Sequence, residues 1–231
     1  MQTKDLIETL RQNEDPEKSV QMEKYMRNQF QFIGLQAGKR RALAQDFLKE
    51  KKLETKMRAT NATTDESVLD WKMLLMFWEL PEREFQLIGL DYLKQNEKYL
   101  VLADFENLRQ LVLTKSWWDT IDFLAKSIGS LVQKEPQLIE DMKEWSMEEN
   151  IWIRRVAILH QLAFKEKTNA VLLEEVILPN MRDDEFFIQK AIGWSLREYA
   201  KTDEAWVRNF VTRYKEVLSP LSYREAVKNL K

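Results

Sequence analysis

The stretch Thr114-Lys115-Ser116-Trp117-Trp118-Asp119-Thr120-Ile121-Asp122 places two tryptophans and two carboxylates at the start of an apolar pattern. From Trp117 onward, apolar side chains recur at intervals of three and four residues, which is typical of one buried face of an α-helix. We therefore expect Trp117 to belong to the core. Trp118 and Asp122 lie four residues apart on an adjacent flank. The apolar stripe consists of Ile121, Leu124, Ile128, Leu131 and Val132.

The flank that carries Trp118 and Asp122 has two interpretations. Trp118 can be a partly exposed tryptophan and Asp122 a residue packed against a neighbouring element, because large aromatic side chains are seldom fully buried. Alternatively, the two side chains form part of a functional surface. Position in the helix does not separate these interpretations.

The composition of the 231 residues favours an all-α fold. Only 5 glycines and 5 prolines are present, which leaves few residues for the tight turns of a β protein. There is no cysteine, which excludes disulfides, thiolate catalysis and cysteine-ligated metals. The longest apolar runs, such as Met73–Trp78, are too short to span a bilayer. We expect a protein of the bacterial cytosol with no membrane association.

Proline and capping residues predict most helix boundaries. Asp15-Pro16-Glu17 provides an N-cap, a proline at the first helical position and an early acidic residue. The residues from Phe32 to Gly38 read as a connection. Ser222 and Glu225 have the spacing of a capping box that begins the last helix. The predicted helices cover about 1–14, 16–30, 39–52 and 66–79, others begin near Pro81 and Pro136, and one closes at Pro179.

Four apolar-rich helix starts recur at a nearly fixed period. Phe85, Trp118, Ile151 and Phe186 are separated by 33, 33 and 35 residues. A period of this size is typical of stacked helical pairs, and we predict one α-solenoid domain over residues 1–231 with a concave binding surface. Four residues after these helix starts, the same position in each repeat forms a row of Gly89, Asp122, Arg155 and Lys190.

Two residues near this row are unusual for their helical faces. Arg155 lies on an apolar flank, so it must pair with a carboxylate or bind an anion, because an unpaired buried charge is very costly. Asp122 is the obvious partner, and an ion pair that only braces two repeats is one interpretation. Trp194 shares the polar face of its helix with Lys190 and Arg197, so we favour a surface-lining role for it.

Several kinds of chemistry lack the residues they need. His160 is the only histidine, so a histidine-based zinc site is excluded and we expect no bound metal. We place Arg154 and Gln161 on the solvent side of their helix and His160 near it, and we interpret His160 as a bystander. No phosphate-binding glycine loop or dinucleotide fingerprint occurs, so we expect neither a nucleotide nor another cofactor. A carboxylate, tryptophans and arginines remain, and such a set suits cationic transition states.

Three strings resemble the signatures of the AlkD-type DNA alkylation repair proteins, which are HEAT-like-repeat alkylpurine DNA glycosylases. The strings are Thr114 to Asp122, Asn150-Ile151-Trp152-Ile153-Arg154-Arg155, and Glu185-Phe186-Phe187-Ile188-Gln189-Lys190-Ala191-Ile192-Gly193-Trp194. The similarity continues through Leu80 to Gln86 and Leu196 to Lys201 and covers nearly the whole chain in one register.

The resemblance implies hydrolysis of the N-glycosidic bond of cationic N3- or N7-alkylated purines, such as 3-methyladenine and 7-methylguanine, in duplex DNA without base flipping. It assigns the catalytic carboxylate to Asp122, the sugar-facing indoles to Trp118 and Trp194, and the cleft arginine to Arg155. The DNA contacts that it implies are Tyr25, Gln36, Lys115, Arg154, Phe186, Phe187, Lys190 and Arg197.

Features near the two ends decide how far the resemblance extends. Residues 15–28 look like the amino-terminal helix that grips duplex DNA in active members, which favours a monomeric, monofunctional glycosylase. Ala37-Gly38 stands where the family pattern has proline, and Tyr223 replaces a basic residue. The alternative is a non-catalytic helical-repeat protein that binds unusual DNA structures or a protein partner.

Overall fold

The computed structural model describes residues 2–230, and the elements that it forms are helices. Within these residues the only strand-like feature is an isolated parallel bridge between Gln31 and Glu82. The all-α fold predicted from the sequence is therefore confirmed. The chain groups into two compact units, one up to Asn107 and the other from Leu108, and the boundary lies inside helix α6 (Phe105–Leu113). The expectation of a single domain stays a prediction.

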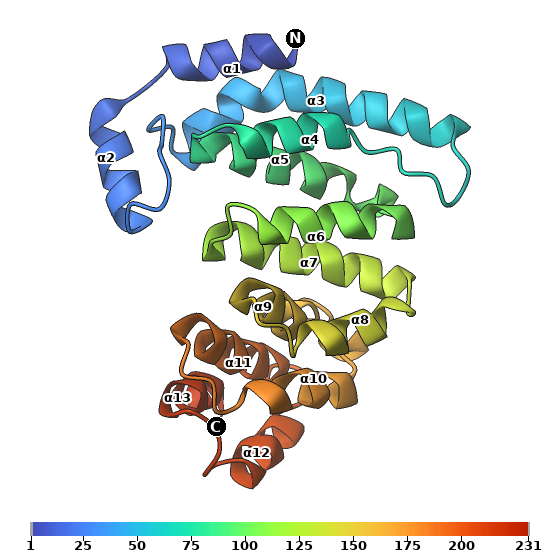
Figure 1. Ribbon diagram of the computed structural model, residues 1–231. Coiled ribbons are helices and arrows are strands. Elements are labelled where there is room, and N and C mark those ends of the chain that lie inside the picture. The colour runs from blue at the N-terminus through green and yellow to red at the C-terminus, as the bar shows by residue number, and fades with distance from the viewer. Residues whose placement is uncertain (1, 231) are drawn as a thin grey trace. The chain divides into compact units, whose positions relative to one another are not determined.

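Unit 1 is built around a long helix. Helix α3 packs against α1 and α5, and α4 packs against α5 (Figure 1). Helix α2 contributes no fully buried side chain. The helices of this unit are α1 (Thr3–Gln12), α2 (Pro16–Tyr25), α3 (Ala37–Asn61), α4 (Trp71–Glu79), α5 (Arg83–Asn96) and the 3-10 turns η1 (Glu97–Tyr99) and η2 (Leu102–Asp104).

Unit 2 consists of helices that pack in succession. Helix α9 packs between α7 and α11, and α13 packs on α11; α8 and α10 contact each other and α9 (Figure 1). The helices are α7 (Trp118–Lys134), α8 (Leu138–Trp145), α9 (Ile151–Leu159), α10 (Ala170–Ile177), α11 (Phe186–Tyr199), α12 (Glu204–Arg213) and α13 (Pro220–Ala226), with 3-10 turns η3 (Lys165–Lys167), η4 (Leu178–Asn180) and η5 (Val227–Asn229).

The repeat markers fall where the period placed them. Trp118, Ile151 and Phe186 are the first residues of α7, α9 and α11, and Phe85 lies in the first turn of α5. Side-chain caps explain two of these starts, those of α9 and α11. The Asn150 side chain accepts hydrogen bonds from the backbone N–H groups of Trp152 and Ile153, and such caps are worth about 1 kcal/mol.

Four predicted boundaries in unit 1 were wrong. Helix α2 ends at Tyr25 rather than near Phe30. Helix α3 begins at Ala37 and runs to Asn61, so residues assigned to a connection form its first turn, and the helix extends nine residues past the predicted end at Lys52. Lys and Glu are good helix formers, which accounts for the extension. Helix α4 begins at Trp71 rather than near Glu66, because the Asp70 side chain accepts a hydrogen bond from Met73 N–H.

The cap of the last helix is Ser219 rather than Ser222. Ser219 accepts the backbone N–H of Ser222 at 3.0 Å, and Pro220 occupies the first helical position. The hydroxyl of Ser222 is buried and donates to the backbone carbonyl of Gln189 in α11 at 2.9 Å. The apparent capping box is therefore a contact between two helices.

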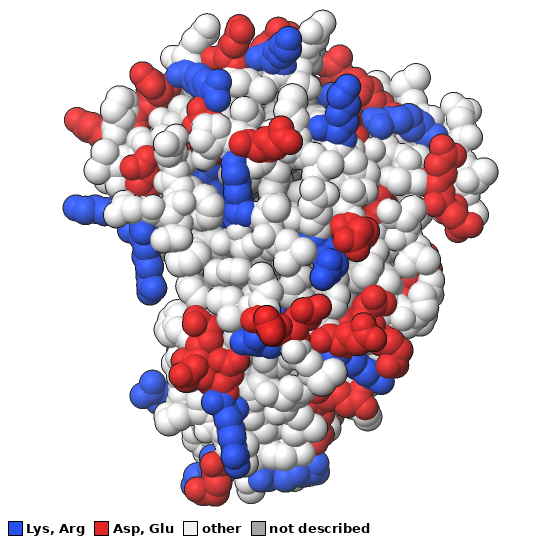
Figure 2. All heavy atoms as spheres, viewed as in Figure 1, with Lys and Arg blue, Asp and Glu red and all other residues white. Residues whose placement is uncertain are grey.

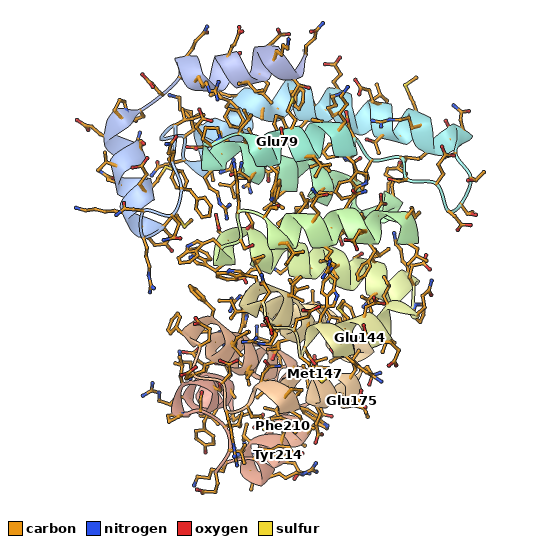
Figure 3. All side chains as sticks on the ribbon, viewed as in Figure 1. Glu79, Glu144, Met147, Glu175, Phe210 and Tyr214 are labelled. Atoms are coloured by element: carbon orange, nitrogen blue, oxygen red, sulfur yellow. The ribbon has the colours of Figure 1, made fainter. Side chains whose placement is uncertain are left out.

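The core follows the sequence pattern closely. The stripe of α7 from Ile121 to Val132 is buried, as predicted. Aromatic contacts extend the core to α12 and the residue after it, since the tilted rings of Phe210 and Tyr214 lie 4.8 Å apart between centroids (Figure 3). The packed core of unit 2 therefore supports the flank of α7 that carries Trp118 and Asp122.

Candidate active site

Asp122 and Arg155 form a two-pronged ion pair between α7 and α9. Arg155 Nε lies 2.8 Å from Asp122 Oδ1, and Arg155 Nη2 lies 3.1 Å from Asp122 Oδ2. Arg155 also donates through Nη1 to the backbone carbonyl of Phe187 in α11. One guanidinium therefore connects three successive helices. The pair that the repeat period predicted is present in the structure.

Asp122 remains accessible although its partner is buried. The side chain of Arg155 is 5% exposed and that of Asp122 is 20% exposed. Burial raises the pKa of Asp122 above its ordinary value, and the hydrogen bonds and charge of Arg155 oppose that rise. Two carboxylate oxygens offer about four acceptor positions, of which Arg155 occupies two. Asp122 can therefore accept further hydrogen bonds from a water molecule or a ligand.

A cleft of about 290 Å³ lies over the exposed edge of Asp122, and we call it the reaction cleft. The tryptophans expected to flank Asp122 both line it, one from α7 and one from α11. The cleft thus combines a carboxylate, two indoles and cationic side chains within unit 2. Its lining residues are Trp118, Asp122, Arg155, Phe186, Phe187, Lys190, Trp194 and Arg197.

A cluster of aromatic rings supports this cleft. The ring of Phe187 lies 5.2 Å from Trp117 and 4.9 Å from Trp152, measured between centroids, and it touches Phe186. Trp117 precedes the first turn of α7 with an extended backbone and is only partly buried. Its expected place in the core stripe was therefore wrong, since a residue outside the helix does not follow the helical period.

Two comparisons with known proteins bear on this arrangement. A model of the family described as DNA alkylation repair enzyme matches residues 6–230. The chain belongs to the DNA alkylation repair enzyme family. A solved structure titled "Predicted DNA alkylation repair enzyme from Enterococcus faecalis" is similar with 36% sequence identity and a TM-score of 0.81, and the match covers 94% of this chain and 96% of that one. A search of curated proteins found no match.

In this AlkD-like protein, two of the cations expected to bind DNA are paired with the same carboxylate. Lys190 Nζ lies 3.0 Å from Glu225 of α13, and Arg197 also contacts this carboxylate. Lys228 lies 2.6 Å from it. Hydrogen bonds from Lys228 above all, and also from Lys190 and Arg197, lower the pKa of Glu225 to about 2 against the effect of burial.

Arg154 is likewise held inside the AlkD-like fold. Its guanidinium donates to Asp183 at 2.8 Å and to the backbone carbonyl of Glu148 at 2.7 Å. The side chain is only 16% exposed, so its expected place on the solvent side of α9 was wrong. Lys115 is half-buried and has a φ of 50° in the turn before α7. Binding of DNA by Arg154 and Lys115 stays a prediction.

Tyr25 and Gln36 lie in unit 1, where a buried carboxylate holds the segment before Gln36. Glu84 accepts the backbone N–H groups of Ile33, Gly34 and Leu35 at 2.9 to 3.0 Å. Tyr25 closes α2 and is 71% exposed, and Gln36 is the exposed N-cap of α3. Both side chains are therefore on the surface, and their contact with DNA stays a prediction.

His160 and Gln161 are buried, so their expected place near solvent was wrong. Helix α9 ends at Leu159, and the chain then turns inward. Full burial lowers the pKa of His160 to about 4. His160 Nδ1 lies 2.6 Å from the Ala157 carbonyl, and Gln161 bonds the backbone of Asn169. A buried neutral histidine fits the predicted bystander role, which remains a prediction.

Charges on the surface are mixed. Basic and acidic side chains alternate on the face shown in Figure 2 rather than gathering by sign. Within residues 2–230, no cluster of three His, Asp or Glu side chains is arranged to hold a metal ion, and no helix is long and apolar enough to cross a membrane. Sequence reasoning overlooked Lys126, although its place four residues after Asp122 puts it on the same flank of α7.

Proposed function

We propose that this protein is a monofunctional DNA glycosylase that removes cationic N3- or N7-alkylated purines from duplex DNA by hydrolysing the N-glycosidic bond. The observation that carries this proposal is the reaction cleft, whose lining includes a fixed and partly exposed carboxylate together with two indoles. The family assignment supports a role in DNA alkylation repair.

An alkylated purine is already positively charged, so it leaves as a neutral base and needs little acid catalysis. The barrier then lies in the positive charge that develops on the deoxyribose. Asp122 stabilises this charge electrostatically and orients a water molecule toward the sugar carbon. A charge held in place before the reaction needs no reorganisation during it, and Arg155 provides this preorganisation.

Trp118 and Trp194 act on the same developing charge. The face of an indole attracts cations, and two indoles beside the carboxylate favour an oxocarbenium-like sugar over a neutral one. We propose that both rings contact the deoxyribose while the base stays stacked in the duplex. Work from the sugar side needs no deep base pocket, which accords with the small volume of the reaction cleft, about 290 Å³.

The decisive experiment measures base release from methylated duplex DNA by the wild type and by Asp122→Asn. We expect the substitution to slow release of 3-methyladenine and 7-methylguanine by about 10²- to 10³-fold, equivalent to roughly 3 to 4 kcal/mol, because the amide carries no charge. Asp119→Asn is the matched control, since Asp119 lies on the same helix and does not line the cleft. Equal release by all three proteins would refute the proposed mechanism.

The two-pronged Asp122–Arg155 pair also favours a second candidate, a non-catalytic protein that binds unusual DNA structures or a protein partner. An ion pair between two helices can serve only to brace them. Base release at the buffer rate by the wild type, together with tight binding of branched or intact duplex DNA, would support this second function and exclude the first.

A further inference from the structure

Helix α9 is shorter than α7 and α11, and a hollow lies beside its carboxyl end. Helix α9 has 9 residues, whereas α7 has 17 and α11 has 14. The hollow measures about 430 Å³ and is bounded by the turn after α9, by η3 and by the second half of α11. Trp194 lines both this hollow and the reaction cleft, so the two are adjacent.

Two lysines of this hollow differ from the other cations near the cleft. Lys126 of α7 and Lys165 of η3 both line the hollow and are exposed. Neither forms an ion pair with any residue from 2 to 230, although the charge of Lys126 acts on Asp122. By contrast, Lys190 and Arg197 share the Glu225 carboxylate, and Arg154 is bound to Asp183.

Pairing decides how strongly a cation attracts a phosphate. A carboxylate bound to a lysine cancels part of the positive electrostatic potential of that lysine. A phosphate must then displace the carboxylate or share the lysine with it. An exposed lysine without a carboxylate gives up only counterions and water. Glu166 and Glu198 also line the hollow, and Glu198 is paired with Lys201. Lys126 and Lys165 are therefore the lysines of this hollow that no carboxylate of the described chain pairs with directly, and the sequence did not single them out.

Lys126 is also well placed along the helix. It follows Asp122 by one helical turn, which is a rise of about 6 Å on the same flank of α7. A ligand whose sugar lies over Asp122 would therefore pass Lys126 with the adjoining part of its backbone. Apolar residues of the hollow, including Ile158 and Leu162, supply a low-polarity wall that strengthens such a charge interaction.

We propose that Lys126 and Lys165 form a backbone-phosphate site that binds DNA next to the reacting nucleotide. The proposal rests on the proposed function insofar as duplex DNA is the ligand. Lys126 and Lys165 bind the DNA backbone and take no part in bond cleavage. Lys190 and Arg197 then serve chiefly to fix α13 against α11 through Glu225.

The test measures binding of a fluorescent undamaged duplex, and of one with a stable abasic-site analogue, as a function of salt. We expect Lys126→Gln and Lys165→Gln each to reduce the slope of log affinity against log salt by about 0.9, and to weaken binding roughly five- to tenfold at 0.1 M salt. Lys215→Gln is the matched control, because Lys215 is an exposed lysine without an ion pair in unit 2 and does not line the hollow.

A second measurement links one lysine to one phosphate. Single neutral methylphosphonate linkages are placed in turn along the duplex. At one position, the neutral linkage weakens binding by the wild type but has no further effect on Lys126→Gln, because the same contact is already lost. Equal affinities and slopes for Lys126→Gln, Lys165→Gln and Lys215→Gln would overturn the proposal. Binding is read without base release, so this result is independent of whether the protein is a glycosylase.

Discussion

Asp122 and Arg155 depend on each other because each would be a buried charge without the other. Asp122 is mostly covered, and its partner is almost completely buried. Removing one member of such a pair costs far more than the pair contributes, since the remaining charge loses its compensation. The same two residues therefore determine the stability of unit 2 and the electrostatics of the reaction cleft.

Substitution of Arg155 tests how much the ion pair contributes to the stability of unit 2. We expect Arg155→Ala to lower the free energy of unfolding by about 3 kcal/mol and the midpoint of thermal unfolding by roughly 6 to 12 °C, because Asp122 is left unpaired. Arg155→Lys keeps the charge but loses the two-pronged geometry. Its stability should therefore lie between those of the wild type and Arg155→Ala. Unfolding in urea and by heat measures both.

The double variant Asp122→Asn with Arg155→Ala provides the control for this prediction. Its stability should exceed that of Arg155→Ala alone, because no uncompensated carboxylate remains. If Arg155→Ala is as stable as the wild type, the ion pair does not brace α7 and α9. Base release by Arg155→Ala should also fall, since the pKa of Asp122 rises further without its partner.

At the scale of helices, the sequence predicted the central contact of the site, whose two residues lie within regular helices, although Arg154 in α9 is more covered than its position indicated. The spacing from Trp118 to Ile151 placed Asp122 opposite Arg155, and the structure has this pair. The prediction failed where the helical period was extended past a helix end. His160 and Gln161 follow the last residue of α9, and Trp117 precedes the first residue of α7. In such turns, side-chain direction depends on the local backbone and not on the period.

Other ion pairs between helices that are far apart along the chain could not be predicted from the sequence. Glu225 looked like part of a helix cap, but it binds cations from α11 because α13 packs against that helix. Nothing in the spacing of Lys190 and Glu225 reveals this contact, since they lie on different elements. The sequence therefore predicted the ion pair at the centre of the candidate site and the two indoles beside it. It did not predict which carboxylates pair with the surrounding cations.

The close approach of α7 to the turn after α9 predicts that a side chain at Gly129 destabilises the protein. A Cβ atom added there would lie 1.9 Å from the backbone carbonyl oxygen of His160, and backbone cannot move aside cheaply. We expect Gly129→Ala to reduce the free energy of unfolding by about 1 to 3 kcal/mol. Gly38→Ala in the first turn of α3 is the control, because no atom lies within 4 Å of the added methyl group.

The control should change stability in the opposite direction. Alanine in an open helical position stabilises by roughly 0.5 to 1 kcal/mol relative to glycine, because the unfolded chain has less freedom to lose. Urea unfolding curves measure both variants. A Gly129→Ala protein as stable as the wild type would show that α7 and the turn after α9 can separate without cost.

At the scale of the whole molecule, the formal net charge of −2 hides how the charges are used. Many cations are joined to carboxylates within the fold, so they contribute to stability rather than to a positive field. The response of the protein to pH should therefore depend on these pairs. Glu225 is the strongest example, since three cations surround one carboxylate of low exposure.

Acid unfolding should report the Glu225 cluster. Because folding lowers the pKa of Glu225 from 4.5 to about 2, its stabilising effect is present above pH 4.5 and is lost as the pH falls toward 2. The shift corresponds to at most roughly 3 kcal/mol, and screening of the partly exposed lysines reduces this to about 1 to 2 kcal/mol. The stability gap between wild type and Glu225→Gln should therefore be widest near pH 7 and should close between pH 4.5 and 2. Glu216→Gln, at an exposed glutamate that forms no ion pair with residues 2–230, should track the wild type throughout. A gap for Glu225→Gln that stays constant down to pH 2 would mean that packing at this position, and not the charge of the carboxylate, fixes α13 against α11.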